Sequence, residues 1–81
     1  MYYWRAGIKH TGEANYSLVY FRTENLNCAV DVIDMFENYG LQTCNCFFHR
    51  LNVCEYIANA LFLPVATLNN FQNYSRSVLI G

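Results

Sequence analysis

The sequence predicts one small α+β domain with a mainly antiparallel sheet and two helices, in the order β-β-α-β-α-(β). Two observations carry this prediction. Residues 2–10 and 16–22 are rich in aromatic and β-branched types and flank a short turn-like stretch, which is typical of a β-hairpin. From residue 26 to residue 39, apolar residues recur at three- and four-residue steps, which indicates an amphipathic helix. The 81 residues contain no repeat or linker, so we expect a single domain over residues 1–81.

Each strand of the predicted hairpin has two faces, because side chains alternate along an extended chain. In residues 2–10 the face expected to be buried holds Tyr2, Trp4, Ala6 and Ile8. The face expected to meet solvent holds Tyr3, Arg5, Gly7 and Lys9. Strand 16–22 has apolar residues on both faces, so we expect both to be partly covered; one of them carries Tyr16, Leu18, Tyr20 and Arg22.

The first helix has recognisable ends. Asn25 or Asn27 can accept hydrogen bonds from the free N–H groups of its first turn, and Gly40 suits the left-handed conformation that commonly ends a helix. A strand is predicted directly after it, from Leu41 to Arg50. The face of this strand that we expect to pack on the helix includes Cys44, Cys46 and Phe48.

A second helix is predicted from Val53 to about Leu63. Asn52 and Glu55 have the spacing of a capping box, which satisfies two free N–H groups at the helix start. Pro64 ends the helix because the residue before a proline is pushed out of the helical region.

The remaining residues are expected to close the sheet. Residues 65–68 form a short strand or a turn, Asn69 and Asn70 form a break, and residues 77–80 form a closing strand. We expect both helices on one face of the sheet, so that the other face needs a cover.

Charge and aromatic content limit the classes of function. Charged residues make up 14% of the chain and aromatic residues 17%, so some rings are expected to be exposed or covered by a partner. Five Lys and Arg against six Asp and Glu give a net charge of −1. This balance argues against a bulk electrostatic binder of nucleic acid and against a strongly acidic DNA mimic.

The N-terminus lacks the pattern of a secretory signal, and the longest uncharged stretch, 56–75, contains Pro64 and several Asn residues. We therefore expect a cytoplasmic protein without a membrane segment. In a reducing compartment its four cysteines are free thiols. The densest group of metal-ligand types comprises Cys44, Cys46, His49 and Cys54, but its spacing matches no common zinc site, so no metal and no cofactor is expected.

An enzyme is not expected. Cys28 and Cys54 lie near predicted helix starts, yet nothing places either of the two histidines beside a thiol. The sequence has no Gly-rich phosphate loop, nucleophile elbow or metalloprotease motif.

Two surfaces are candidates for an interface. The first is the outer face of the hairpin, with the residues Tyr3, Arg5, Lys9, Tyr16, Tyr20 and Arg22. The second is an acidic ridge on the first helix, with Asp31, Asp34 and Glu37, which could steer toward a basic groove on another protein. Rings and cations on a sheet are also what single-strand binders use, so a sheet-based single-stranded nucleic-acid-binding protein is the alternative.

The strand-strand-helix-strand layout of residues 2–50, the lack of a catalytic motif and the Tyr- and Asn-rich composition complete the pattern. In these respects the chain resembles small phage and mobile-element proteins that inhibit bacterial defence, the anti-CRISPR proteins among them. The resemblance implies a non-enzymatic inhibitor in the host cytoplasm that binds a host protein or ribonucleoprotein complex, such as a defence nuclease, and blocks it. It implies no role for any single residue. On this interpretation direct nucleic-acid binding is not expected, and a homodimer stays open.

Overall fold

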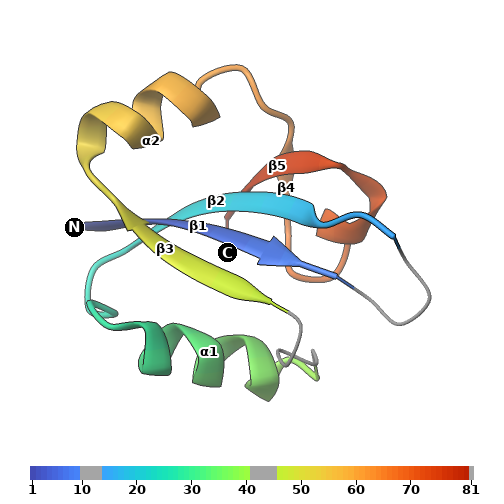
Figure 1. Cartoon of the computed structure of the whole chain (residues 1–81), viewed down its shortest axis with the longest axis horizontal. Helices are drawn as coiled ribbons and strands as arrows, with labels where there is room; N and C mark the ends of the chain where they lie inside the picture. Colours follow the sequence, from blue (N-terminus) through green and yellow to red (C-terminus); the bar gives the residue numbers. More distant parts are fainter. Residues whose placement is uncertain (10–13, 41–45, 81) are drawn as a thin grey trace.

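The computed structural model describes residues 1–9, 14–40 and 46–80, and it confirms an α+β fold with one five-stranded sheet and two helices (Figure 1). The turn predicted between the hairpin strands falls mostly on residues 10–13, outside the described residues. The elements along the chain are β1 (Tyr2–Ile8), β2 (Ser17–Thr23), α1 (Ala29–Asn38), β3 (Phe47–Leu51), α2 (Val53–Ala60), β4 (Val65–Ala66), the 3₁₀ helix η1 (Phe71–Asn73) and β5 (Arg76–Leu79).

The sheet is mixed, which corrects the prediction of a mainly antiparallel one. Its strand order is β3-β1-β2-β5-β4. The hairpin pairing of β1 with β2 is antiparallel as predicted, and β3 lies antiparallel on the other side of β1. The C-terminal strand β5 instead runs parallel to both β2 and β4. Strand patterns identify faces but not neighbours, so the parallel half of the sheet was not predictable in this way.

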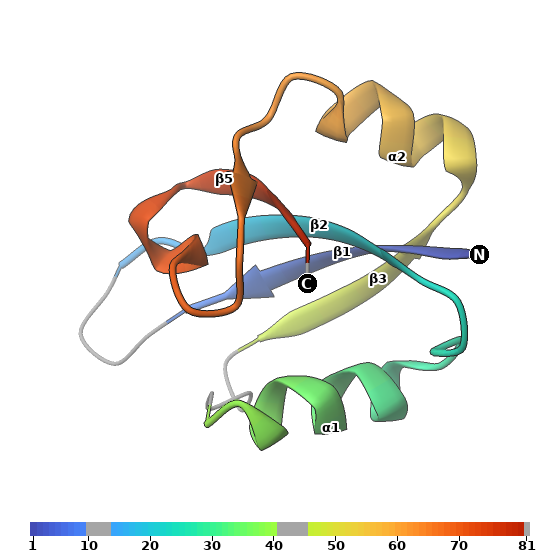
Figure 2. The same cartoon turned by 180° about the vertical axis from the view of Figure 1, so that it is seen from behind.

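The two helices cover opposite faces of the sheet, not one face as predicted (Figures 1 and 2). The pairings make β2, β3, β4 and β5 mutually parallel, so α1 and α2 each lie in a crossover between parallel strands. The first crossover, from β2 to β3, moves across the sheet in the direction opposite to the second, from β3 to β4. Because such crossovers share one hand, a reversal of direction places the second helix on the other face.

The larger core lies between the sheet and α1, on what we call the α1 face. Trp4, Ala6 and Ile8 are buried there, as the alternation of residues 2–10 predicts. Phe36 of α1 contacts the rings of Phe21 and Phe48 at centroid distances of 5.6 and 5.5 Å. Cys46 packs against the same core, while Cys44 lies outside the described residues.

A smaller core lies on the opposite, α2 face. Tyr20, Leu51 and Ala60 are buried in it, and the ring of Tyr3 packs against that of Tyr56 with centroids 4.9 Å apart. These contacts gather at the end of the sheet where β1 begins, and Figure 1 shows α2 above that end only. The α2 face is therefore half covered.

The helix ends follow local chemistry, with one correction. Gly40 has a φ of 83° after α1, and Asn52 and Glu55 form the predicted capping box at the start of α2. The N-cap of α1 is Cys28, not Asn25 or Asn27, and its side chain makes no capping hydrogen bond. The helix begins later than the apolar pattern suggests because Leu26 uses its carbonyl to accept hydrogen bonds from the Trp4 indole and the Thr23 hydroxyl.

Tyr56 is half-buried between α2, to which it belongs, and the sheet. This burial makes the stability of the fold depend on pH in the alkaline range. Desolvation raises the pKa of this phenol above its ordinary value of 10.0; the charge of Arg22 lowers it in part, and neighbouring Tyr3 adds to the rise. The unfolded chain therefore releases the proton first, so the free energy of unfolding is expected to fall as the pH rises above about 10. Tyr56→Phe should flatten this fall in denaturant titrations at pH 8 to about 11. An equal pH dependence in both proteins would refute the assignment.

Candidate functional site

The uncovered half of the α2 face carries a cluster of cations and rings, which we call the open patch. It consists of Arg5, Lys9, Arg76, Tyr16, Phe47 and His49. Arg22 shares this sheet face but lies opposite Tyr3, at the end that α2 covers, and is therefore not part of the open patch. Alternation places these residues on one face: Leu51 and Val78 face α2, so Phe47 and His49 share their side of β3 and Arg76 shares that of β5. The register brings Arg5 between His49 and Tyr20.

The rings of the open patch form a connected row. Phe47 contacts Tyr16 edge to face with centroids 5.3 Å apart, and it contacts His49 at 5.1 Å. Lys9 Nζ lies 5.4 Å from the centre of the Tyr16 ring, a cation–π distance. Because β1 runs between β2 and β3, Phe47 reaches Tyr16 by crossing over the glycine at position 7. Tyr16 and His49 are exposed, so the row faces solvent.

Gly7 makes this crossing possible, since a Cβ built there would overlap the Phe47 ring. Gly7→Ala is therefore expected to displace the ring and lower the free energy of unfolding by about 1–3 kcal/mol. In a Phe47→Ala background the same change should be neutral or stabilising, because alanine suits a strand better than glycine does. A double-mutant cycle by urea denaturation measures this coupling. Equal costs in both backgrounds would show that the ring does not depend on Gly7.

The cations of the open patch lack counter-charges. Within the described residues, Arg5 and Arg76 make no side-chain hydrogen bond or ion pair, and Lys9 has only its contact with Tyr16. The fifth cation, Arg50, lies on the α1 face, where it donates to the Asn27 carbonyl and stacks on Tyr2. Four of the five Lys and Arg residues of the chain thus lie on the α2 face, and three of them lie on its uncovered half.

The described carboxylates lie elsewhere. The predicted acidic ridge is exposed on α1, at Asp31, Asp34 and Glu37, across the sheet from the open patch. Glu55 belongs to the capping box of α2, and Glu24 follows β2. Among the described residues, three of the five carboxylates thus lie on α1, whereas four of the five cations lie on the opposite, α2 face.

The structure divides the residues predicted as one hairpin interface. Arg5, Lys9 and Tyr16 come together in the open patch, whereas Arg22 lies at the covered end of the sheet, near Tyr56. Tyr20 is only 1% exposed and Tyr3 is half-buried against Tyr56, which corrects the expectation that these two rings meet solvent. The reason is the position of α2, which supplies the cover that the second face needs. The acidic ridge and the hairpin face do not form a common surface.

Three residues of the open patch escaped the prediction: Phe47, His49 and Arg76. The alternation of residues 41–50 does place Phe47 and His49 together, opposite the cysteines. That they share a face with Arg5 and Lys9 depends on the pairing of β3 with β1, and Arg76 joins through the parallel pairing of β5 with β2.

The predicted group of metal-ligand types is not assembled by the described residues. His49 lies on the α2 face, whereas Cys46 packs on the α1 face and Cys54 is exposed on α2. Among residues 1–9, 14–40 and 46–80, no three His, Cys, Asp or Glu side chains gather as metal ligands would. Cys44 lies outside these ranges.

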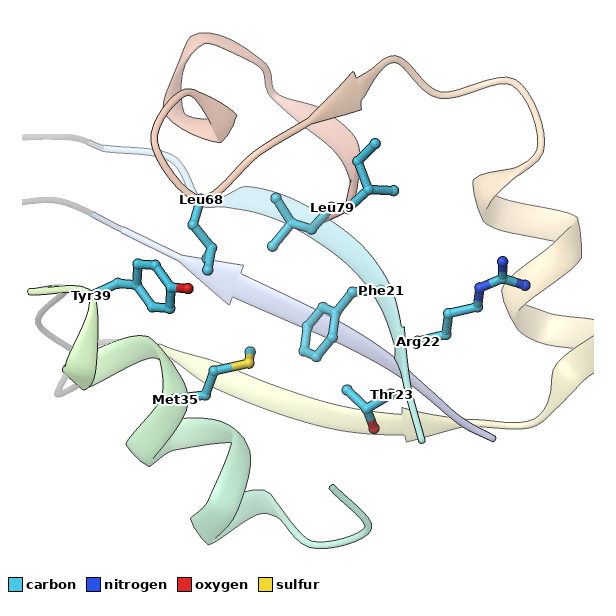
Figure 3. A pocket seen from close by; sticks show the side chains of 8 residues that line it. Phe21, Arg22, Thr23, Met35, Tyr39, Leu68 and Leu79 are labelled. Carbon is cyan, nitrogen blue, oxygen red and sulfur yellow. The ribbon is translucent and has the colours of Figure 1, made fainter. Parts of the chain in front are cut away.

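An apolar groove of about 150 Å³ lies on the α1 face, between α1 and the C-terminal strand (Figure 3). Met35, Leu68 and Leu79 point into it, whereas Arg22 contributes only to its rim and extends away toward α2. Ligand pockets usually measure about 300–1,000 Å³ and contain a few convergent polar groups. The groove is smaller and mainly apolar, so the open patch is the better candidate for a binding site.

Within the part of the chain that the structure describes, no helix is long and apolar enough to cross a membrane. No protein-family model matches this chain, and no curated protein or solved structure shows significant similarity to it.

Proposed function

We propose that this protein binds single-stranded nucleic acid on the open patch. The observation that carries the proposal is the concentration of three cations and three rings on an uncovered half of the sheet, with no ion pair among the described residues to neutralise the cations. Phosphates would contact the cations and unpaired bases would stack on the rings, as they do in proteins that bind single-stranded nucleic acid.

The dimensions of the open patch suit a short strand. From Arg5 to Lys9 is four residues, or about 13 Å along β1, and from β3 to β5 is three strand spacings, or about 14 Å. This area accommodates a few nucleotides, toward the small end of the range of about 4–16 nucleotides that single-strand-binding folds occupy.

The net charge of −1 argues against attraction of a polyanion, but the positive and negative side chains lie mainly on opposite faces of the sheet. Electrostatic attraction falls off over a Debye length of about 8 Å at physiological salt, so a phosphate on the α2 face responds mainly to the nearby cations. The acids of α1 lie on the other side of the sheet, beyond both packed layers. Net charge therefore underestimates the local field at the open patch.

The protein-interaction module inferred from the sequence is the second candidate. An acidic protein surface would also satisfy the three cations, but exposed rings in a row add nothing specific for carboxylates, whereas they provide stacking platforms for bases. The observation that favours a protein partner lies instead on α2, where apolar side chains are exposed. An inhibitor that binds and blocks a defence nuclease complex would be one protein of this second class.

Fluorescence anisotropy with a labelled single-stranded oligonucleotide of about ten nucleotides tests the proposal. Three phosphate contacts to a single strand give a salt slope of about −2, so affinity should fall about 20-fold between 50 and 200 mM salt. A duplex of the same sequence should bind more weakly, because its bases are stacked internally. Absence of binding at 50 mM salt would refute the proposal; tight binding of polyglutamate without binding of the oligonucleotide would assign the open patch to a protein partner.

A further inference from the structure

Helix α2 presents an apolar surface to solvent as well as to the sheet. Val53, Ile57 and Leu61 follow one another at four-residue steps and remain 43%, 53% and 67% exposed. Phe62, next along the chain, is 92% exposed. We call these four residues the α2 stripe.

The packing of α2 shows that the stripe is not needed inside the domain. The helix already contacts the sheet through Tyr56 and Ala60, on a different side from the stripe. Between Val53 and Leu61 its polar side chains are Glu55 and Asn59, which leaves apolar residues on more than half of its circumference. An apolar helix side that exceeds what the sheet covers is normally buried against another surface.

We propose that the α2 stripe binds a second copy of this chain. A standard interface buries about 800 Å² on each partner, and in homodimers about 65% of it is apolar, so roughly 500 Å² of apolar surface is needed. From their exposed fractions, the four side chains of the stripe leave on the order of 500 Å² in water. The stripe alone thus supplies the apolar part of a stable dimer interface.

The stripe is also compatible with two-fold symmetry. In an antiparallel pair of α2 helices, Ile57 would lie beside its own copy and Val53 would face Leu61 of the second chain, as a self-complementary interface requires. No stripe residue carries a charge, so like charges do not meet at the axis. Because α2 lies on the same side of the sheet as the open patch, the dimer would hold two patches and bind a long strand through both.

Sedimentation equilibrium of the 81-residue chain at about 1 to 300 µM tests the dimer. We expect the mass to rise from 9.4 kDa toward twice that value with concentration, and Ile57→Glu to hold it at 9.4 kDa. Val30→Glu is the matched control, because Val30 is an apolar residue 66% exposed on α1, and it should dimerise like the parent. Circular dichroism verifies that both variants fold.

A parent chain that stays at 9.4 kDa throughout this range would overturn the proposal, as would a dimer that Ile57→Glu leaves intact. This test of dimerisation can be distinguished from the test of nucleic-acid binding on the open patch. Monomeric Ile57→Glu should bind an oligonucleotide of about ten nucleotides as well as the parent does, because one patch accommodates a few nucleotides. Its affinity for a strand several times longer should fall below that of the parent, since the second patch is lost.

Discussion

Reversing the charges of Arg5 and Arg76 together is expected to weaken single-strand binding by at least about 100-fold at 50 mM salt. Two charge-assisted contacts of about 1.5 kcal/mol or more are lost, and two carboxylates then repel the phosphates. The two side chains approach the ligand from β1 and β5, so the double variant spans the open patch. Anisotropy titrations of Arg5→Glu/Arg76→Glu against the parent measure the loss, and the salt slope should fall below half its original value.

Arg50→Glu is the matched control for this experiment. It makes the same change of charge on the α1 face, where Arg50 contacts Tyr2 and the Asn27 carbonyl. Its affinity should stay within a few-fold of the parent. Equal losses in Arg50→Glu and in the double variant would mean that overall charge, not the open patch, determines binding.

Trp4→Ala is expected to have the largest effect on stability. Trp4 is 2% exposed on the internal strand β1, lies beside Phe21 at a centroid distance of 6.5 Å and donates its indole N–H to the Leu26 carbonyl at 3.0 Å. Truncation of a buried Trp costs about 3–5 kcal/mol, and a domain of this size has about 4–12 kcal/mol in total. We expect the variant to be largely unfolded at 25 °C or to lose most of its urea midpoint, measured by circular dichroism.

Trp4→Phe separates packing from hydrogen bonding at this position. It retains a ring but leaves the Leu26 carbonyl with one hydrogen bond fewer, so a loss of about 1–2 kcal/mol is expected. A Trp4→Ala variant within about 1 kcal/mol of the parent would contradict the position assigned to Trp4 in the main core.

Much of the fold follows from local pattern. The alternation of residues 2–10 identifies the face that Trp4 buries, and the spacing of Asn52 and Glu55 identifies the start of α2. Neighbour relations between strands do not follow from such patterns. The parallel pairing of β5 with β2 and the position of α2 opposite α1 depend on long-range contacts and crossover direction, which leave no periodic signal in the sequence.

The candidate site likewise contains some residues that the sequence predicts to be neighbours and others that it does not. Arg5, Lys9 and Tyr16 are predictable as neighbours because they belong to one hairpin, whose register is fixed by its own two strands. Arg76 lies more than fifty residues from Arg22, the last of the hairpin cations, and enters the site only through tertiary structure. The burial of Tyr20 was hidden for a similar reason, because its cover comes from a helix that lies far away in the sequence.

A ¹H–¹⁵N correlation spectrum recorded during titration with a single-stranded oligonucleotide tests the central claim most directly. If the open patch is the binding site, shifts should concentrate in the amides of β1 from Arg5 to Lys9 and at Tyr16, Phe47, His49 and Arg76, with α1 unchanged. The same spectrum would contradict the claim if no amide moved at low salt, or if the shifts gathered on α1.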